Sequence, residues 1–456
     1  MLKQIKGLNL RTPLLIMLLA GGIGAAAVGC KATGNDAVKE DTTEAEANQN
    51  MKEEEASDEA AESTGQRLKS PEVSEKTMEA LVAGNTQFAL DLYAKVSTES
   101  DNVFYSPFSV SEALTMVSAG ARGETAKQMM ETLNLDLEPS ELHPAFNALD
   151  TKLMNLGEKP QKPTSEPFQL TIANSIWGQT GENFKPEFVN TLGANYGAGL
   201  STLDFVNGAE PARKEINAWV EEKTQERIKD LMPEGSVTAD TRLVLTNAIY
   251  FKASWMADFQ KEATQQGDFT LRDGSKVKAD LMNQVAFFDY AEMDGFKAVA
   301  LPYDGGDASM LVLLPEDLAK FEASLSADTL NDTVAALEKK NVALTLPKFE
   351  FTAPLTLTHT LKAMGMADAF SDSADFSGIA DSGLSISEVI HKAFVAVDES
   401  GTEAAAATGI SMRVTSMPAE PVQFKADKPF IFVIRDNTTG SVLFMGRLAN
   451  PSAQAE

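Results

Sequence analysis

Residues that build metal centres and disulfides are scarce in this sequence. The 456 residues include one cysteine, Cys30, and three histidines, His143, His359 and His391. A single cysteine excludes a disulfide within the chain, and three histidines leave little for a zinc or copper site. Carboxylate-bound calcium or magnesium stays open, although the sequence has no Asp/Asn/Gly loop of the calcium-binding type. We therefore expect no metal and no cofactor.

Positive charge is also in deficit. Lysine and arginine together number 39 against 66 aspartates and glutamates, which gives a formal net charge of -27. This balance argues against nucleic acid, heparin-like polyanions and anionic lipid surfaces as main partners. Hydrophobic residues make up 43% and charged residues 23%, a globular composition that suits one large domain or two ordinary ones.

Signatures of the common enzyme classes are missing as well. The sequence has no G-x-S-x-G nucleophile turn and no glycine-rich phosphate loop. A hydrolytic triad would need a histidine beside a serine and an acid, and His391 lies in an apolar, strand-like run. An enzyme is therefore the disfavoured alternative, and we expect that the protein is not one.

Residues 1–29 have the pattern of an export signal. A basic stretch with Lys3, Lys6 and Arg11 precedes an apolar run that is too short and too rich in Gly and Ala for a membrane span. Small residues directly before Cys30 resemble a bacterial lipoprotein cleavage box, with Ala27 where leucine is preferred. We expect a lipid anchor at Cys30, with the protein held at the cell surface or envelope, or secreted. The alternative is an ordinary signal peptide with a chance cysteine.

Residues 30–73 are predicted to be an acidic, disordered tether. Between Asp36 and Glu62 there are eleven acidic residues and two lysines, so this stretch supplies -9 of the net charge. Its apolar residues are nearly all alanine, and such a segment cannot bury enough surface to offset its ordering entropy. Repulsion between its charges would keep it extended.

The remainder, 74–452, has an α+β order with helices mostly early and strands mostly late. Apolar residues recur at helical spacing from residue 78 to 92, and residues 211–231 predict a second helix that begins near a proline. The run Leu243–Phe251 is almost entirely apolar, which is typical of a central strand buried on both faces. Asn247 interrupts that run, and a buried asparagine needs polar partners, so we expect a polar cluster there.

A loop of small residues separates two strand-like runs near the C-terminus. It extends from Asp398 to Pro421, and a structureless connection of about twenty residues in a compact domain is usually functional. As a strand it would place Thr402, Ala404, Ala406 and Thr408 on one face, small enough to fit into an existing sheet. The alternative is an Ala-rich helical turn or a solvated linker.

Four motifs in the C-terminal domain resemble those of the serpins. The resemblance covers the chain from Ser74 to Pro451 and implies a fold with three β-sheets, about nine helices and an exposed reactive-centre loop at about 400–420. It also implies an inhibitor of serine proteases, and a monomer is the default expectation. The motifs are Asn102–Ser109, Leu245–Trp255 (with Ala253 where glycine is common), Phe424–Phe432 and Phe444–Pro451.

The same resemblance implies a mechanism and a reactive bond. Family spacing from the hinge places the scissile bond at Thr415–Ser416, where a serine protease would form a covalent acyl complex before the loop inserts into the central sheet. Thr415 is small, which favours an elastase-like target. With a different register, Met412 or Met417 would suit a chymotrypsin-like enzyme and Arg413 a trypsin-like one, and a cysteine protease would also be conceivable. The implied hinge residues are Glu399, Gly401, Thr402, Glu403, Ala404, Ala405, Ala406, Ala407 and Thr408.

Two further groups of residues carry over from the family. Lys348, with Trp255 and Glu399, matches the top of the sheet where the loop first inserts, and a Lys348–Glu399 ion pair is expected to resist early insertion. The alternative for that pair is a surface contact of little value. A non-inhibitory carrier or chaperone is the rival function, although the small hinge residues argue against it. Residues that match the cluster beneath the parting strands, and that could equally be satisfied core groups, are Ser106, Ser109, Asn247 and His391.

Overall fold

The computed structural model describes residues 67–69, 71–98, 100–156, 162, 168–197, 199–402 and 420–453. All of them belong to one compact unit. No helix among these residues has the length and apolar character needed to cross a bilayer. In the described residues the α-helices are α1 Glu75–Val96, α2 Pro107–Ser118, α3 Gly123–Thr132, α4 Pro139–Met154, α5 Pro186–Tyr196, α6 Phe205–Lys223, α7 Leu318–Ser324, α8 Ala327–Ala335 and α9 Thr358–Met364.

Local sequence signals explain where the early helices begin. The Ser74 hydroxyl accepts a hydrogen bond from the Thr77 amide at the start of α1, and the Ser106 hydroxyl accepts one from the Ser109 amide at the start of α2. Serine in this position satisfies an amide that has no partner within the helix. Pro107 occupies the first turn of α2, where a missing N–H costs nothing.

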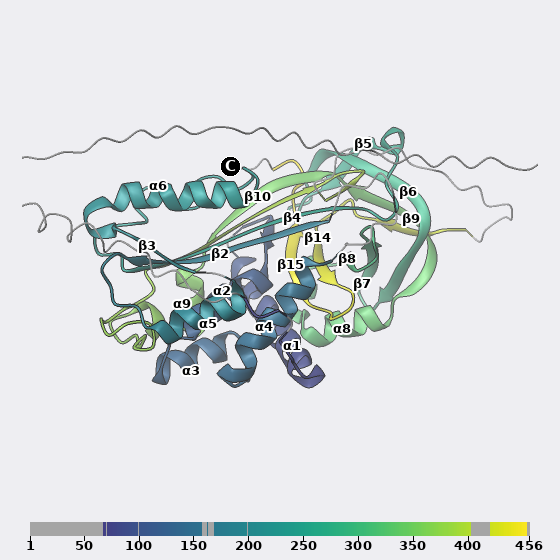
Figure 1. The fold of residues 1–456 in the computed structure, drawn as a ribbon. Coiled ribbons are helices and arrows are strands. Elements are labelled where there is room, and N and C mark those ends of the chain that lie inside the picture. Colours follow the sequence, from purple (N-terminus) through teal and green to yellow (C-terminus); the bar gives the residue numbers. More distant parts are fainter. Residues whose placement is uncertain are drawn as a thin grey trace, which may run out of the picture. The chain divides into compact units, whose positions relative to one another are not determined.

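The six-stranded sheet is the centre of the molecule, with strand order β10-β11-β12-β4-β2-β3. Its third member in this order, β12, has only two residues, and β11 pairs directly with β4 as well. Helices α2 and α4 contact one face of this sheet and α6 covers the other, as Figure 1 shows. The strands are β2 Gln169–Gln179, β3 Leu200–Leu203, β4 Leu243–Ser254, β10 Phe349–Thr356, β11 Glu388–Val397 and β12 Gly401–Thr402.

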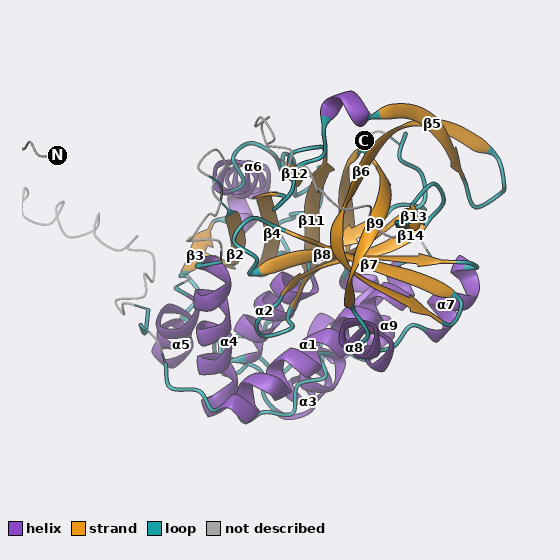
Figure 2. Cartoon of the chain, turned by 90° about the vertical axis from the view of Figure 1, so that its right-hand side faces the viewer, coloured by secondary structure: helices purple, strands orange, loops and turns teal. Residues whose placement is uncertain are grey.

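A second, nine-stranded sheet contains the remaining strands of the described chain (Figure 2). Its longest strand, β6, pairs with β5 and β9 over its first part and with β7 at its end. The second and third of the three predicted sheets are therefore continuous through β6. The strands are β1 Val103–Tyr105, β5 Gln265–Thr270, β6 Lys276–Met293, β7 Phe296–Pro302, β8 Ala308–Pro315, β9 Glu338–Pro347, β13 Val422–Lys425, β14 Phe430–Asp436 and β15 Val442–Leu448.

The helix predicted over residues 211–231 has different bounds. Helix α6 begins at Phe205, kinks at Gly208 and ends at Lys223. The kink lets Pro211 occupy the first turn of the second helical segment, where proline is tolerated. Residues 225 and 226 then adopt positive φ, which ends the helix. Ile228 and Leu231 are buried with apolar residues of α6, but they belong to the non-helical segment that follows this helix.

Candidate functional site

The site is built around β12, which lies between β11 and β4 at one end of the six-stranded sheet. Thr402 pairs with Val397 of β11 on one side and with Ala253 of β4 on the other. Gly401 pairs with Ser254. The first two residues of the predicted hinge after Ser400 are thus already part of the sheet.

The fit at this position requires small residues. A side chain on Gly401 would bring a Cβ within 2.1 Å of the Ala253 carbonyl oxygen, so only glycine is accommodated. The Thr402 side chain is 1% exposed, and its hydroxyl lies 2.8 Å from the Tyr303 hydroxyl. Tyr303 in turn stacks on Trp255, with ring centroids 4.7 Å apart. The start of the hinge therefore contacts a pair of stacked aromatic side chains.

A tight turn presents the hinge to the sheet. The Asp398 carboxylate accepts hydrogen bonds from the amides of Ser400 (2.7 Å) and Gly401 (3.2 Å). Burial raises the pKa of Asp398 despite these bonds. The predicted residue Trp255 holds the turn from below: its indole N–H donates to the Asp398 carbonyl (3.0 Å) and its amide to the Ser400 carbonyl (2.9 Å).

Glu399 carries an ion pair beside the turn. The Lys348 ammonium group donates to Glu399 Oε2 at 2.8 Å, and the Thr264 hydroxyl donates to Oε1 at 2.7 Å. The Glu399 side chain is 6% exposed and that of Lys348 37%. Burial alone would raise the pKa of Glu399, but the bonds from Lys348 and Thr264 outweigh it and the pKa is lowered. The pair is thus half-buried rather than a surface contact, and hydrogen-bonded on both oxygens.

Strands β11 and β4 pair directly along only part of their length, and β12 lies between them at one end. Strands β11 and β4 pair in parallel from Glu388–Val244 to Ala393–Ile249, and the next contact across the sheet runs through Thr402. The sheet is therefore closed at one end and opened by a two-residue wedge at the other. A strand that extends β12 would have to part the parallel pair.

The polar cluster expected around Asn247 lies where the parallel pair is closed. The imidazole of His391 on β11 contacts the Asn247 side chain on β4 and accepts a hydrogen bond from the Ser106 amide at 3.1 Å. Asn247 also donates to the Ser109 hydroxyl at 2.6 Å. The structure thus brings together the four residues that sequence reasoning grouped, and their bonds connect β11, β4 and α2.

Sequence reasoning missed one member of this cluster. Asn174 on β2 faces Asn247 in the strand register and hydrogen-bonds to it. Its amide group also donates to the Ser109 carbonyl (3.1 Å) and to the Glu112 carboxylate (2.8 Å). An asparagine within an apolar, alternating strand is the same signal that identified Asn247, so it was present in the sequence.

His391 predicts an acid-sensitive fold. Burial lowers the pKa of His391 to about 3, whereas an unfolded histidine titrates near 6.5. The stability that this neutral ring contributes is complete above pH 6.5 and falls as the pH drops from there toward 3, by about 1.4 kcal/mol per unit. Between pH 7 and 4.5, the midpoint of thermal unfolding of wild type should fall more than that of His391→Gln.

His143 requires its own control in this experiment. Burial lowers the pKa of His143 to about 4, and its ring lies 2.7 Å from the Tyr196 hydroxyl, away from the cluster. The His143→Gln variant should remove part of the same pH dependence and the double variant more than either. Equal pH profiles for wild type and all three variants would contradict this assignment.

Several predicted residues lie outside the described residues. They are Cys30, Glu403, Ala404, Ala405, Ala406, Ala407, Thr408, Thr415 and Ser416. Among the residues that the structure does describe, no group of three or more His, Cys, Asp or Glu side chains could hold a metal ion.

A family model described as "Serpin (serine protease inhibitor)" matches residues 83–451. The chain belongs to the serpin family. The leukocyte elastase inhibitor of Sus scrofa is 40% identical to this serpin over 389 residues, which is 82% of this chain and all of that protein. An uncharacterised serpin-like protein of Thermococcus kodakarensis is 38% identical over 394 residues, covering 85% of this chain and 90% of that protein.

Solved structures agree with this assignment. Uncleaved ovalbumin superposes with a TM-score of 0.72 at 29% identity, over 82% of this chain and all of that one. The thermophilic serpin tengpin in its native state gives a TM-score of 0.76 at 28% identity, over 86% of this chain and 99% of that one. The predicted serpin fold is confirmed.

The expectation that the protein is simply not an enzyme is corrected by these comparisons. The family model and several relatives are named as inhibitors of proteases, so the supported class of activity is inhibition of an enzyme. Serpins are not enzymes in the catalytic sense, yet they act on a catalytic partner, which a plain absence of activity does not describe.

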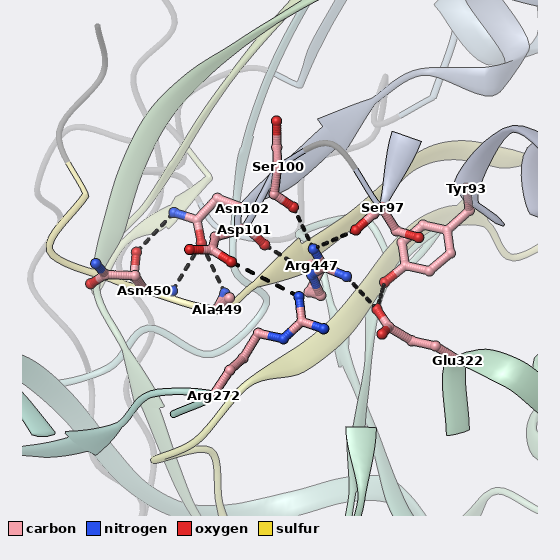
Figure 3. Close-up of polar contacts among 10 residues, drawn as sticks. All are labelled: Tyr93, Ser97, Ser100, Asp101, Asn102, Arg272, Glu322, Arg447, Ala449 and Asn450. Atoms are coloured by element: carbon pink, nitrogen blue, oxygen red, sulfur yellow. Dashed lines mark hydrogen bonds and ion pairs between the residues drawn. The ribbon is translucent and has the colours of Figure 1, made fainter. Parts of the chain in front are cut away.

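A buried arginine fixes the C-terminal strand of this serpin (Figure 3). Arg447 on β15 is 0% exposed and pairs with Glu322 of α7. The Tyr93 hydroxyl donates to the same carboxylate at 2.7 Å. Arg447 also donates to the carbonyls of Ser97 (3.0 Å) and Asp101 (2.8 Å), so all three of its nitrogens donate hydrogen bonds. The connection between α1 and β1 is thereby tied to the last strand of the nine-stranded sheet.

Proposed function

We propose that this serpin inhibits an elastase-like serine protease by suicide cleavage at Thr415–Ser416. The observation that carries the proposal is the position of Gly401 and Thr402 between β11 and β4. A strand that already begins inside the sheet can be extended into it once its far end is released. After Thr402 the sequence continues through Gly409 with one glutamate, four alanines, one threonine and one glycine, and all but the glutamate are small.

The proposed reaction starts as ordinary proteolysis. The protease serine attacks the Thr415 carbonyl carbon, an acyl-enzyme ester forms, and the C–N bond to Ser416 breaks with the new amine taking a proton. Residues from Gly401 to Thr415 then insert between β11 and β4 before water can hydrolyse the ester. Fifteen residues at ~3.3 Å each span about 50 Å, enough to carry the tethered protease along the whole sheet.

Two features of the described residues support insertion as the driving step. Strands β11 and β4 pair directly in parallel over only six residues of each, and an inserted strand would replace that contact with two antiparallel ladders. The active form is then metastable, held by a kinetic barrier. The Glu399 ion pair and the Asn247–His391 cluster both bridge elements that must move, which makes them candidates for that barrier.

The elastase-like target rests on Thr415 and on the names of relatives. A small, β-branched residue suits a shallow specificity pocket, and leukocyte elastase inhibitors of three mammals are 39–40% identical to this chain. We extend that target class to this serpin as part of the proposal.

The decisive experiment mixes residues 67–456 with an elastase and resolves the products on denaturing gels. We expect a covalent band at the summed mass, together with a released peptide that begins at Ser416 by mass spectrometry. The Thr415→Arg variant is the matched control. It should no longer form the covalent complex with elastase and should form one with trypsin instead. Cleavage without any covalent band from elastase, chymotrypsin or trypsin would favour the non-inhibitory rival, and a peptide with a different first residue would correct the register.

A further inference from the structure

One asparagine–glycine pair occurs in the sequence, Asn207-Gly208, and it lies at the start of α6. Asn207 is exposed and Gly208 is half-buried. A Cβ placed on Gly208 would meet only Pro211, at 3.9 Å, so the backbone is uncrowded here. Because glycine has no side chain to shield its amide, that nitrogen can closely approach the side-chain carbonyl carbon of the preceding asparagine.

The turn that holds this pair is set apart from the rest of α6. Gly208 has non-helical angles (φ -145°, ψ 45°), and Pro211 has no N–H that could bond back to the Asn207 carbonyl. The Gly208 amide donates to the Asp204 carbonyl at 3.1 Å, and this bond must open before the amide nitrogen can react. A single turn at the end of a helix opens at a much lower cost in free energy than the body of the helix.

Asn207 also completes the cap of this turn. Its backbone amide donates to Asp204 Oδ1 at 3.0 Å, and its side-chain amide donates to Oδ2 at 2.9 Å. The bond from the Asn207 side chain is the largest of the contacts that lower the pKa of Asp204. An aspartate at position 207 would replace this donor with a second carboxylate that faces the first, and like charges at this distance repel.

The capped turn anchors α6 over the six-stranded sheet, which this helix covers (Figure 1). Phe205, the residue after Asp204, is 0% exposed and belongs to the apolar cluster that α6 forms with the sheet. The same cluster includes Ala248 of β4 and Phe394 of β11, the two strands between which β12 lies. Parting β4 from β11 must therefore rearrange the contacts of α6.

We propose that Asn207 is a site of spontaneous deamidation, and that its product loosens α6 over the strands that the hinge must part. The Gly208 amide nitrogen loses its proton to solvent base and attacks Asn207 Cγ. A C–N bond forms, and the Cγ–Nδ2 bond breaks as ammonia leaves with a proton from water. Water then opens the cyclic imide to aspartate or isoaspartate. The site itself is independent of the proposed function, whereas its effect on α6 rests on that function, because it requires insertion between β4 and β11.

The first test follows the peptide that contains residue 207 by mass spectrometry. Purified uncleaved protein is incubated at mildly alkaline pH beside a urea-unfolded sample. We expect the folded protein to deamidate within about tenfold of the unfolded rate, because the turn opens locally. Gly208→Ala is the matched control: alanine fits the space and the φ of -145°, but its side chain shields the amide, so deamidation should slow at least tenfold in both samples. Protection by the fold of more than a hundredfold, or equal rates in wild type and Gly208→Ala, would overturn the assignment.

The second test measures the effect of the product with no protease present. Asn207→Asp carries one product from the start, and Asn190→Asp adds the same charge at an exposed position of α5. Loss of the uncleaved form is followed on urea-gradient gels at one temperature below the unfolding midpoints. We expect the half-life of Asn207→Asp to be shortened at least threefold and that of Asn190→Asp to change less than twofold. Equal half-lives would overturn the effect on α6. A wild type that never converts would refute the proposed metastability, and that effect with it, but not the deamidation site.

Discussion

Replacing Thr402 with arginine is expected to abolish inhibition and turn the protein into an ordinary substrate. Thr402 is 1% exposed and lies between two strands, with its hydroxyl against Tyr303. An arginine there must either bury an unpaired guanidinium, at a cost of several kcal/mol, or leave the sheet and draw the hinge out. Either outcome raises the barrier to insertion, and each 1.4 kcal/mol slows the step about tenfold. Insertion slowed at least a hundredfold would lose to hydrolysis of the acyl-enzyme.

The measurement is the partition between covalent complex and cleaved product. For Thr402→Arg we expect cleavage at the same bond, a covalent yield below about a hundredth of wild type, and full recovery of protease activity. Thr98→Arg, which places the same side chain in an exposed turn, is the matched control and should inhibit as wild type does. A Thr402→Arg protein that still traps protease would falsify insertion through this position.

The residues that revealed the site in the sequence were those that broke a local pattern. Asn247 stood out because it interrupts an apolar strand, and in the structure its side chain contacts those of His391, Ser109 and Asn174. The hinge stood out because most of its side chains are small, in a loop too long for a simple turn. In both cases a single departure from composition or period implied a tertiary constraint.

Other features could not be read from one sequence because they depend on what the chain meets in three dimensions. Arg67 follows an acidic, low-complexity stretch, and its guanidinium pairs with the carboxylate of Asp150, 83 residues away. Tyr303 touches the hinge across a separation of 99 residues. The early end of α6 at Lys223 also follows from tertiary context, since Arg213 and Asn217 both donate to the Met232 carbonyl and hold the next segment against the helix.

In the proposed mechanism, the barrier to insertion would have two locations that act at different stages. The Lys348–Glu399 pair, with Thr264, restrains the turn before β12 and must loosen as the hinge advances. The His391–Asn247 contact is the third pair of the parallel ladder from the β12 side, so it is reached only after the Ala393–Ile249 end has parted. Contacts that are lost before the transition state control the rate of opening, whereas those lost afterwards affect only its completion. The first group should therefore govern how soon insertion begins.

Cleavage at Thr415–Ser416 is expected to raise the unfolding temperature by about 20 °C. A central strand of fifteen residues exchanges backbone hydrogen bonds with both neighbours, and each contributes about 0.5–1.5 kcal/mol net, so the gain is on the order of 10 kcal/mol. For a domain of this size, 1 kcal/mol corresponds to about 2 °C. Calorimetry of uncleaved and cleaved protein measures the shift, at one scan rate because we propose that the uncleaved form is kinetically trapped.

The matched control is Thr402→Arg cleaved at the same bond. It has the same broken peptide but cannot extend β12 past the position where Thr402 meets Tyr303. Its midpoint should stay within about 5 °C of its uncleaved form, whereas wild type rises. If the unfolding midpoints of wild type and Thr402→Arg rise by a similar amount on cleavage, the stabilisation comes from relief of loop strain and not from strand pairing. A rise in neither would mean that the sheet does not accept the loop, and the wedge at Gly401–Thr402 would then be the full extent of insertion.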